Sequence, residues 1–290
     1  MSEPVSRIDL HTHTTASDGT LRPAELVREA SRRGLTHLGI ADHDTTNGLP
    51  EALDEAARHP ELTVIPAVEL SATSTHGGDF HLLGYCIDAA SSALQTALDS
   101  FRRDRESRVE RIVERLRGAG VDITIEQVEA NADGGAVSRA HIGRVLMELG
   151  EVESINEAFD RWLGRNRPAF VPRKPLLTRD AVNLIQDAGG FTVLAHPLTM
   201  GDFRKQLPEL IDAGLVGLEV YYGPYSEDER QMLADTARQH GLIATGGSDF
   251  HGPDHREGRE LGNVRVPECV LDAFVDRCPD LLLNSPDASL

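Results

Sequence analysis

Apolar residues follow two periods that alternate along most of the chain. Short continuous apolar runs, typical of buried strands, occupy 5–10, 35–41, 62–70, 79–87, 191–195, 216–222 and 242–247. Apolar residues spaced three and four apart predict helices between these runs, at 23–34, 47–57, 179–188, 203–213, 227–240 and 268–277. This repetition of strand and helix predicts an α/β fold, in which six or seven such units form a barrel.

The repetition is interrupted after Asp88. Four helical patterns then follow one another with no strand-like run between them, at 91–117, 125–130, 139–149 and 155–163. We therefore expect an all-helical insertion at 91–172 that forms part of a substrate cleft. The barrel domain would be assembled from 1–90 and 173–290.

Side chains that bind metals gather where the predicted strands end, which is where β/α barrels build their active sites. His11 and His13 end the first strand, and the two-residue alternation of a strand points both imidazoles to the same side. Later strand ends bring Asp18, Asp42, His43, Asp44, Glu69, His81, His196, Asp249 and His251, so that six of the 12 histidines lie at such positions.

Each of these residues has a simpler interpretation when taken singly. A histidine after a strand is more often a hydrogen-bonded core or surface residue. The segments 42–44 and 246–249 are also typical of helix caps and turns. Because all of them fall on one face of one predicted barrel, we favour a shared metal site.

Charge and composition narrow the class of partner. Lys and Arg number 29 against 47 Asp and Glu, a net charge of −18 that disfavours tight binding of long duplex nucleic acid. No leader segment and no apolar run near the ~18 residues of a membrane span is seen, so we expect a cytoplasmic protein with no membrane partner. The three cysteines, Cys86, Cys269 and Cys278, are odd in number and widely spaced, which predicts buried thiols rather than disulfides. The alternative is that one of them is a thiol close to the site.

The strand-end residues resemble the four motifs of a known superfamily. His11-x-His13 with Asp18, Asp42-His43-Asp44, Glu69 with His81, Ala195-His196-Pro197 and Gly247 to His251 are similar to those of the PHP (polymerase and histidinol phosphatase) superfamily. Ser138-Arg139-Ala140-His141-Ile142 in the insertion resembles the branch of small bacterial PHP phosphoesterases that includes 3′,5′-nucleoside bisphosphate phosphatases and a 5′-to-3′ exoribonuclease.

The resemblance implies a distorted (β/α)7 PHP barrel that holds two to three divalent metal ions. It implies one metal on His11, His13, Glu69 and Asp249, a second on Glu69, His81 and His196, and a third on Asp18, His43 and His251. Imidazole with carboxylate suits manganese, our first choice, and also iron or zinc.

Such a site predicts a phosphoesterase in which clustered metals activate water for attack on phosphorus. The expected substrate is a small nucleotide such as a 3′,5′-bisphosphate, with trimming of short RNA from its 5′ end as a further activity. Histidinol phosphate hydrolysis and a non-catalytic, metal-stabilised PHP module are the alternatives.

Residues outside the ligand set are assigned substrate roles. Arg139, His141, Arg173 and Lys174 are candidates for binding phosphate, Arg in a bidentate way; Tyr222 and Phe250 are candidates for stacking on a base, with burial in the core as the alternative. Asp42 and Asp44 either orient histidine ligands or protonate the leaving group, and Arg139 and His141 are further candidates for direct catalytic contacts.

Overall fold

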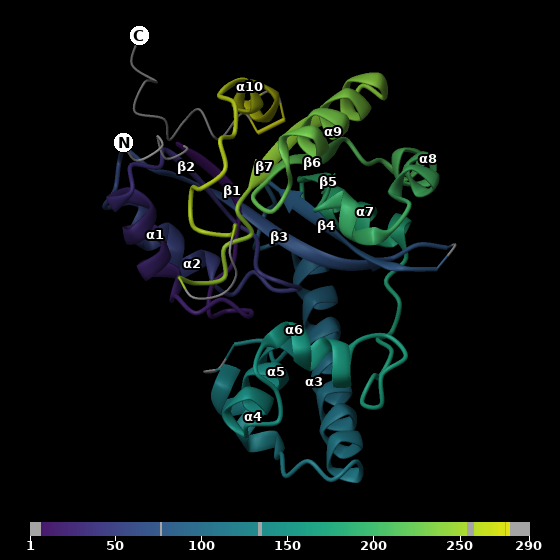
Figure 1. Ribbon diagram of the computed structural model, residues 1–290. Coiled ribbons are helices and arrows are strands. Elements are labelled where there is room, and N and C mark those ends of the chain that lie inside the picture. Colours follow the sequence, from purple (N-terminus) through teal and green to yellow (C-terminus); the bar gives the residue numbers. More distant parts are fainter. Residues whose placement is uncertain (1–6, 76, 133–134, 254–257, 276, 279–290) are drawn as a thin grey trace.

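The computed structural model describes residues 7–75, 77–132, 135–253, 258–275 and 277–278. Seven strands form one sheet in the order β1 to β7, namely Ile8–Thr12, His37–Ile40, Thr63–Thr73, Asp79–Tyr85, Phe191–Leu194, Gly217–Tyr222 and Ile243–Gly247. A parallel bridge between Thr12 and Phe250 places the chain after β7 beside β1. The sheet is therefore nearly closed, and the predicted α/β barrel is confirmed (Figure 1). Residues 5 and 6 of the first predicted strand lie outside the described part.

Strand β4 runs against its neighbours, whereas the other strand pairs are parallel. It pairs antiparallel with both β3 and β5. The rim that collects the carboxyl ends of the parallel strands therefore receives the amino end of β4. His81 reaches this rim from near the beginning of its strand, whereas His11 lies near the end of β1 and the other four histidines follow their strands.

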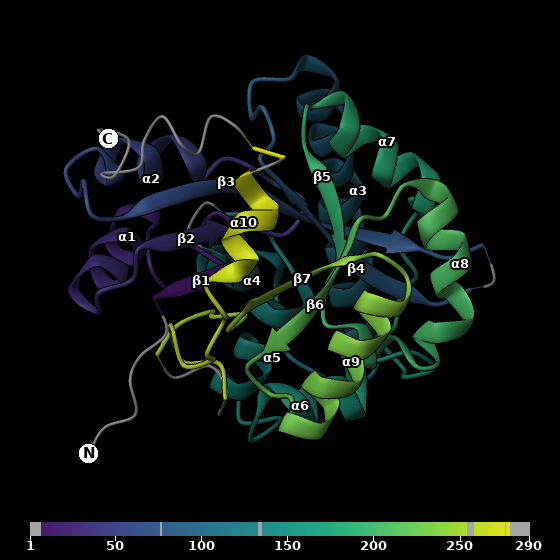
Figure 2. The same cartoon turned by 90° about the horizontal axis from the view of Figure 1, so that it is seen from above.

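Helices cover the outer face of the sheet (Figure 2). They are α1 Pro23–Arg32, α2 Leu49–Ala56, α7 Thr178–Asp187, α8 Phe203–Ala213, α9 Glu227–Gln239 and α10 Cys269–Val275. Pro23 takes the first position of α1, where its missing N–H costs nothing, and Leu26, Val27 and Ala30 bury one face of that helix. Each of the six begins and ends within two residues of the predicted bounds.

The end of the barrel away from the rim is closed by aromatic packing. Phe274 of α10 lies with its ring centroid 5.0 Å from that of Tyr85 and 5.1 Å from that of Phe191, all three being buried. In Figure 1, α10 and the helical insertion lie at opposite ends of the barrel. The closed end leaves the rim that faces the insertion as the place where polar side chains gather.

The cysteine prediction needs a correction. Cys86 follows β4 and Cys278 follows α10, and the structure pairs them as a disulfide with their Cα atoms 6.0 Å apart. Cys269 is free and exposed. The pairing depends on α10 packing across the barrel end, a contact between residues 192 positions apart that spacing alone does not reveal.

The elements of secondary structure that the structure describes between β4 and α7 are all helices. It contains α3 Ser92–Gly118, α4 Ile125–Ala132, α5 Arg139–Glu148, α6 Ile155–Ala158 and a π-helical turn, Phe159–Leu163. Buried residues such as Val109, Ile142 and Leu163 form a hydrophobic core of their own. A separate core supports treating 91–172 as a domain, and that division stays a prediction.

In the described part of the chain no helix is both long and apolar enough to cross a membrane.

Candidate metal centre

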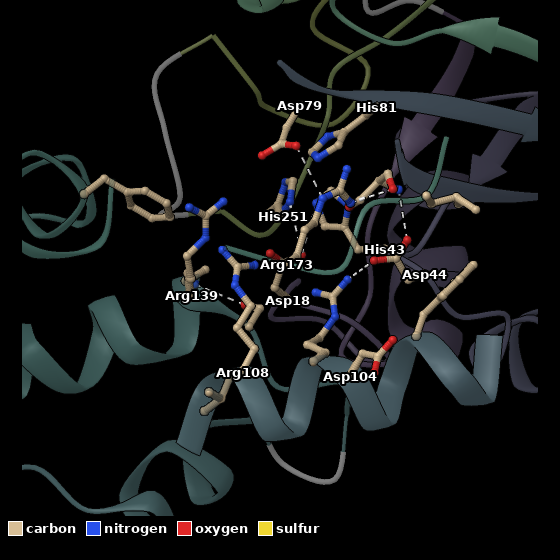
Figure 3. Close-up of a pocket in the computed structure, with 18 of the residues that line it drawn as sticks. Asp18, His43, Asp44, Asp79, His81, Asp104, Arg108, Arg139, Arg173 and His251 are labelled. Atoms are coloured by element: carbon tan, nitrogen blue, oxygen red, sulfur yellow. Dashed lines mark hydrogen bonds and ion pairs between the residues drawn. The ribbon is translucent and has the colours of Figure 1, made fainter. Parts of the chain in front are cut away.

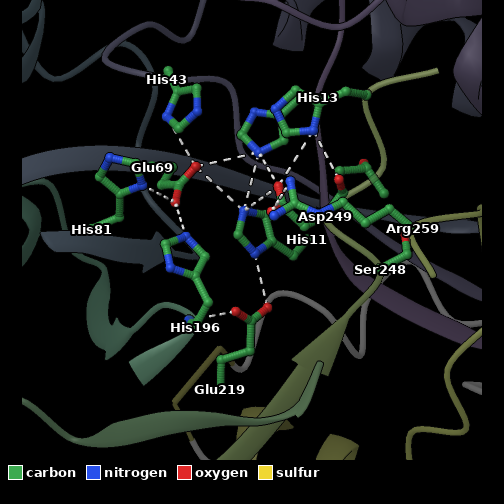
Figure 4. Close-up of polar contacts among 12 residues, drawn as sticks. His11, His13, His43, Glu69, His81, His196, Glu219, Ser248, Asp249 and Arg259 are labelled. Atoms are coloured by element: carbon green, nitrogen blue, oxygen red, sulfur yellow. Dashed lines mark hydrogen bonds and ion pairs between the residues drawn. The ribbon is translucent and has the colours of Figure 1, made fainter. Parts of the chain in front are cut away.

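Glu69 on β3 lies at the centre of the rim, fully buried among imidazoles (Figure 4). Its Oε2 is 3.3 Å from Nε2 of His11, 3.3 Å from Nε2 of His13 and 2.9 Å from Nδ1 of His43. Its Oε1 is 2.8 Å from Nδ1 of His81 and 3.1 Å from Nε2 of His196. One carboxylate thus faces five imidazoles, contributed by four different segments of the chain.

Two further carboxylates extend this cluster. Asp249, after β7, places Oδ1 3.2 Å from His13 Nε2 and 3.6 Å from His11 Nε2. Asp18, in the loop after β1, has its Oδ1 3.3 Å from His251 Nε2. The structure therefore brings together all nine residues predicted as ligands.

Backbone strain accompanies this arrangement. Asp44, His196 and Asp249 have φ angles of 52°, 28° and 56°, in the left-handed region that side chains with a Cβ rarely adopt. Such positions are typical of functional sites, where surrounding contacts hold the strained backbone. Here they turn side chains at strand ends inward over the rim.

Two buried acids that the sequence analysis did not single out as site residues hold the cluster from below. Glu219 on β6 is fully buried; its Oε1 lies 2.8 Å from His11 Nδ1, and its Oε2 accepts the backbone N–H of His196 at 2.7 Å. Asp9 on β1 accepts hydrogen bonds from the N–H and hydroxyl of Ser248. Each acid lies among apolar residues of a predicted strand, and this charged residue in an apolar run could have marked it as a site residue.

These contacts fix which ring nitrogen faces the centre. With His11 Nδ1 occupied by Glu219, its Nε2 points at Glu69. His196 Nδ1 lies 2.9 Å from Thr199 Oγ1, which leaves its Nε2 toward Glu69. A second hydrogen bond that orients an imidazole in this way is typical of histidines that bind metals.

Buried polar atoms in the centre fit a metal-binding role. Some of these contacts are close without the geometry of a hydrogen bond. Among the described residues, the buried atoms that make no hydrogen bond are Nδ1 of His13, His43 and His81, Oδ1 of Asp18 and Oε2 of Glu69. The Nε2 atoms of His11 and His13 approach to 3.0 Å. Three overlapping groups place one ligand atom per residue within 4.8 Å of one another: His11, His13 and Glu69; His43, Glu69 and His81; His13, Asp18, His43 and His251. Nitrogen and carboxylate donors so placed suit divalent transition metals.

The same contacts perturb protonation. Burial disfavours a charged imidazole, yet the carboxylates of Glu219, Glu69 and Asp249 outweigh it and raise the pKa of His11 well above its ordinary value. For Glu69, burial favours the neutral acid, but the charges of His43, His81 and His11 hold its pKa well below the usual range. Metal binding at these nitrogens therefore competes with protons and should weaken as the pH falls.

Asp42 and Asp44 occupy different environments. Asp42 is buried and accepts three hydrogen bonds of 2.6 to 2.7 Å, from the N–H and hydroxyl of Thr14 and from the hydroxyl of Ser17. It does not line the cleft. Asp44 lines the cleft, accepts the N–H of Ser71 at 2.9 Å and pairs with Arg105 of α3. Asp42 thus ties the loop after β1 to the loop after β2, and Asp44 ties the rim to α3; their roles toward a histidine ligand or a leaving group stay predictions.

A cleft of about 370 Å³ lies between the metal-ligand cluster and the insertion. The barrel contributes Asp18, His43, His81, His196, Asp249 and His251 to its lining, and the helical side contributes Arg105, Arg108, Arg139, Ile155 and Phe159. The volume lies within the range of small-molecule sites. Figure 3 shows arginine side chains from α3, α5 and the returning segment pointing into this space.

The predicted substrate residues divide between the cleft and the core. Arg139, Arg173 and Lys174 line the cleft. His141 is buried in α5, where its Nδ1 accepts the Ser138 N–H at 3.0 Å and burial lowers its pKa to about 4.

Tyr222 and Phe250 are 1% and 2% exposed, which matches the alternative of core burial rather than base stacking. The Tyr222 hydroxyl donates to Asp249 Oδ2 at 2.9 Å. These two residues and His141 do not line the cleft; Tyr222 on β6, Phe250 after β7 and His141 on α5 are all buried.

Arg105 and Arg108 of α3 and Arg259 after β7 are cleft residues that the sequence analysis missed. Arg105 interrupts the apolar stripe of α3 between Phe101 and Val109, a signal that was available. Nothing local marks Arg259, whose Nη1 reaches Asp249 Oδ2 at 2.7 Å.

Comparison with known proteins shows to which family this chain belongs. The PHP domain matches residues 9–165, more than half of the chain. The chain belongs to the PHP family. A 5′-3′ exoribonuclease of Salmonella typhimurium is 38% identical over 84% of this chain and 85% of its own length. A 3′,5′-nucleoside bisphosphate phosphatase of Chromobacterium violaceum is 35% identical over 90% of this chain and 92% of its own length.

Solved structures agree with this membership. A Chromobacterium violaceum amidohydrolase determined with bound sulfate and no metal superposes with a TM-score of 0.86 at 32% identity, covering 94% of this chain and 97% of that one. The PHP barrel fold and the predicted superfamily are confirmed. Together these relatives show that the protein is a metal-dependent phosphoesterase, a hydrolase whose rim carries His, Asp and Glu clusters able to bind metal.

Proposed function

We propose that this PHP protein hydrolyses a 3′,5′-nucleoside bisphosphate to the nucleoside 5′-monophosphate and phosphate, and trims short RNA from its 5′ end. The observation that carries the proposal is that the cluster of metal ligands and a group of arginines line one cleft of nucleotide size. Relatives named 3′,5′-nucleoside bisphosphate phosphatase and 5′-3′ exoribonuclease, each spanning most of the chain, support this choice of substrate.

The metal ligands are proposed as three sets, of which the first two share Glu69. One set is His11, His13, Glu69 and Asp249; the second is Glu69, His81 and His196; the third is Asp18, His43 and His251. The short contacts around Glu69 and Asp18 support these groupings. When bound, the ions, which we propose to be manganese, would activate water and neutralise phosphate oxygens.

The remaining side chains bind and orient the substrate. Arg173 donates to the carbonyl of Ser71 at 2.5 Å and pairs with Asp79 at 3.6 Å, so its guanidinium is held at the edge of the cleft. Arg139 from α5 faces the same space (Figure 3). We assign phosphate binding to these two arginines, with Lys174 as an outer, more exposed charge. Asp44, paired with Arg105, joins the rim to α3 and positions His43 beside it.

The test is phosphate release from adenosine 3′,5′-bisphosphate by metal-stripped protein reloaded with manganese. AMP, histidinol phosphate and a short 5′-phosphorylated RNA are run in parallel. Release from the bisphosphate at a rate well above that from AMP and histidinol phosphate is expected. Preferred release from histidinol phosphate, or no release from the bisphosphate at any metal loading, would contradict the proposal.

A further inference from the structure

The loop after β1 that carries Asp18 is contacted by both the barrel and the helical insertion. From the barrel, Asp42 accepts hydrogen bonds from Thr14 and Ser17 of this loop. Asp18 lines the cleft, where its Oδ1 lies 3.3 Å from Nε2 of His251 (Figure 3). The insertion reaches the same loop at its backbone carbonyls.

Two hydrogen bonds join the insertion to these carbonyls. Arg144 of α5 donates from Nη2 to the backbone carbonyl of Asp18 at 2.6 Å. The backbone N–H of Ala136, just before α5, donates to the carbonyl of Ala16 at 3.0 Å. A hydrogen bond from a guanidinium group is charge-assisted and is stronger than one between neutral groups. The insertion therefore holds the main chain of a residue that we propose as a metal ligand.

Gly135 shows how closely the two segments pack. A Cβ added at this position would lie 2.0 Å from the backbone oxygen of Thr15, whereas real Cβ atoms essentially never come within 3.0 Å of another heavy atom. Glycine permits this approach because it has no Cβ. A larger residue would push the insertion away from the loop, and the bonds made by Ala136 and Arg144 would be strained with it.

The first and second ligand sets have supports within the barrel. Glu219 on β6 contacts His11 of the first set and the backbone N–H of His196 in the second. In the third set, Asp18 is bonded instead by α5 of the insertion. A change in the insertion should therefore act on one ligand set and leave the other two in place.

We propose that the helical insertion positions the metal ligand Asp18, with Arg144 as the positioning residue and Gly135 as the point of close packing. The insertion thereby completes the third ligand set, Asp18, His43 and His251. This inference rests on the proposed function, because the three ligand sets belong to it. It makes the insertion a support of the metal centre as well as a wall of the cleft.

The test titrates manganese calorimetrically into the metal-stripped full chain. Arg144→Gln removes the guanidinium bond to Asp18, and Asp18→Asn identifies the ion whose binding needs that carboxylate. Arg161→Gln is the matched control. Arg161 also donates to a backbone carbonyl, that of Glu151 at 2.7 Å, but it is exposed and makes this bond within the insertion.

In Arg144→Gln the ion that Asp18→Asn loses should bind about ten- to a hundredfold more weakly than in the parent, which is the usual effect of losing a support behind a metal ligand. The other ions should bind as in the parent, and Arg161→Gln should match the parent throughout. A manganese titration of Arg144→Gln that matches the parent, or that is weakened equally for every ion, overturns the inference.

A second variant repeats the test without removing a charge. Gly135→Ala should weaken the same ion selectively, and it decides by the same criteria if Arg144→Gln does not fold. Its control is Gly118→Ala at the end of α3, where an added Cβ has open space. A lower Tm of the chelated variants together with normal manganese titrations shows a role in folding only and overturns the positioning role.

Metal binding is measured without turnover, so this inference and the proposed function can fail separately. If the parent releases no phosphate from any substrate, yet Arg144→Gln weakens the ion that Asp18→Asn loses, the inference stands and the proposed reaction fails. If Asp18→Asn binds manganese like the parent, the third ligand set is wrong and the inference fails with it.

Discussion

Replacing Glu219 by Gln should weaken metal binding without touching a proposed ligand. Glu219 is fully buried and serves two donors at once, His11 through Nδ1 at 2.8 Å and the backbone N–H of His196 at 2.7 Å. A carboxylate accepts at both oxygens, whereas an amide offers one oxygen and one NH2 group. In the variant one of the two contacts becomes donor against donor, so the imidazole of His11 or the strained backbone at His196 loses its support.

The expected size follows from what such supporting contacts contribute elsewhere. Losing the hydrogen bond that orients a histidine ligand costs about ten- to a hundredfold in metal affinity, which corresponds to about 1.4 to 2.7 kcal/mol. The free manganese concentration that gives half-maximal phosphate release should rise by that factor. At saturating metal most of the activity should return, because the proposed ligands and the cleft are unchanged.

The assay titrates manganese into metal-stripped parent, Glu219→Gln and a control, Glu229→Gln. Glu229 is a matched glutamate that caps α9 by accepting the N–H and hydroxyl of Ser226, on the outside of the barrel. The control should follow the parent. An unchanged manganese requirement in Glu219→Gln, or activity that stays lost at every metal concentration while bound metal is normal, would refute the positioning role.

Three further predictions follow from the same contacts. Glu69→Gln removes the carboxylate that faces five imidazoles, so elemental analysis should show the loss of more than one equivalent of metal. Phosphoesterase activity should fall by at least about a thousandfold. A normal metal content in the variant would contradict a position of Glu69 between two metal sites. Chelation should lower Tm reversibly, and metal at a hundred times its Kd should restore about 2.7 kcal/mol in the free energy of unfolding; a Tm that ignores metal would argue against ligands joined across the rim. His141 has a pKa of about 4 in the folded protein against 6.5 for the free side chain, so the unfolded chain binds the proton first as the pH falls. Between pH 6.5 and pH 4 the parent should therefore lose up to about 1.4 kcal/mol of unfolding free energy per pH unit relative to His141→Gln. Urea denaturation of both chelated proteins at about pH 7 and pH 5 measures this loss. Parallel stability curves for the two proteins would count against the buried neutral imidazole.

The ligand residues could be predicted because their positions follow from local rules. A two-residue alternation places His11 and His13 on one side of β1, and the apolar runs mark where each strand ends. In a barrel these ends meet at one rim, so residues far apart in sequence could be assigned to one site. The structure brings these residues together, including His81, although β4 runs in the opposite direction.

Contacts that depend on orientation could not be predicted in the same way. His141 and Arg139 lie two residues apart on one helix, yet α5 turns the first into its own core and the second into the cleft. Tyr222 and Phe250 stand at strand ends like the ligands, but both are buried. A strand end fixes where a side chain lies along the barrel axis, and the packing of neighbouring elements decides which way it points.

The sequence by itself determined the α/β barrel, the helical insertion and the residues able to bind metal, because hydrophobic period and residue chemistry are local properties. Only the tertiary structure decided that Glu219 lies under His11, that Cys86 meets Cys278, and that Arg108 and Arg139 line the same cleft. These are contacts between segments distant in the chain. They depend on how the barrel closes and on the side of the rim from which the insertion approaches, which no local pattern encodes.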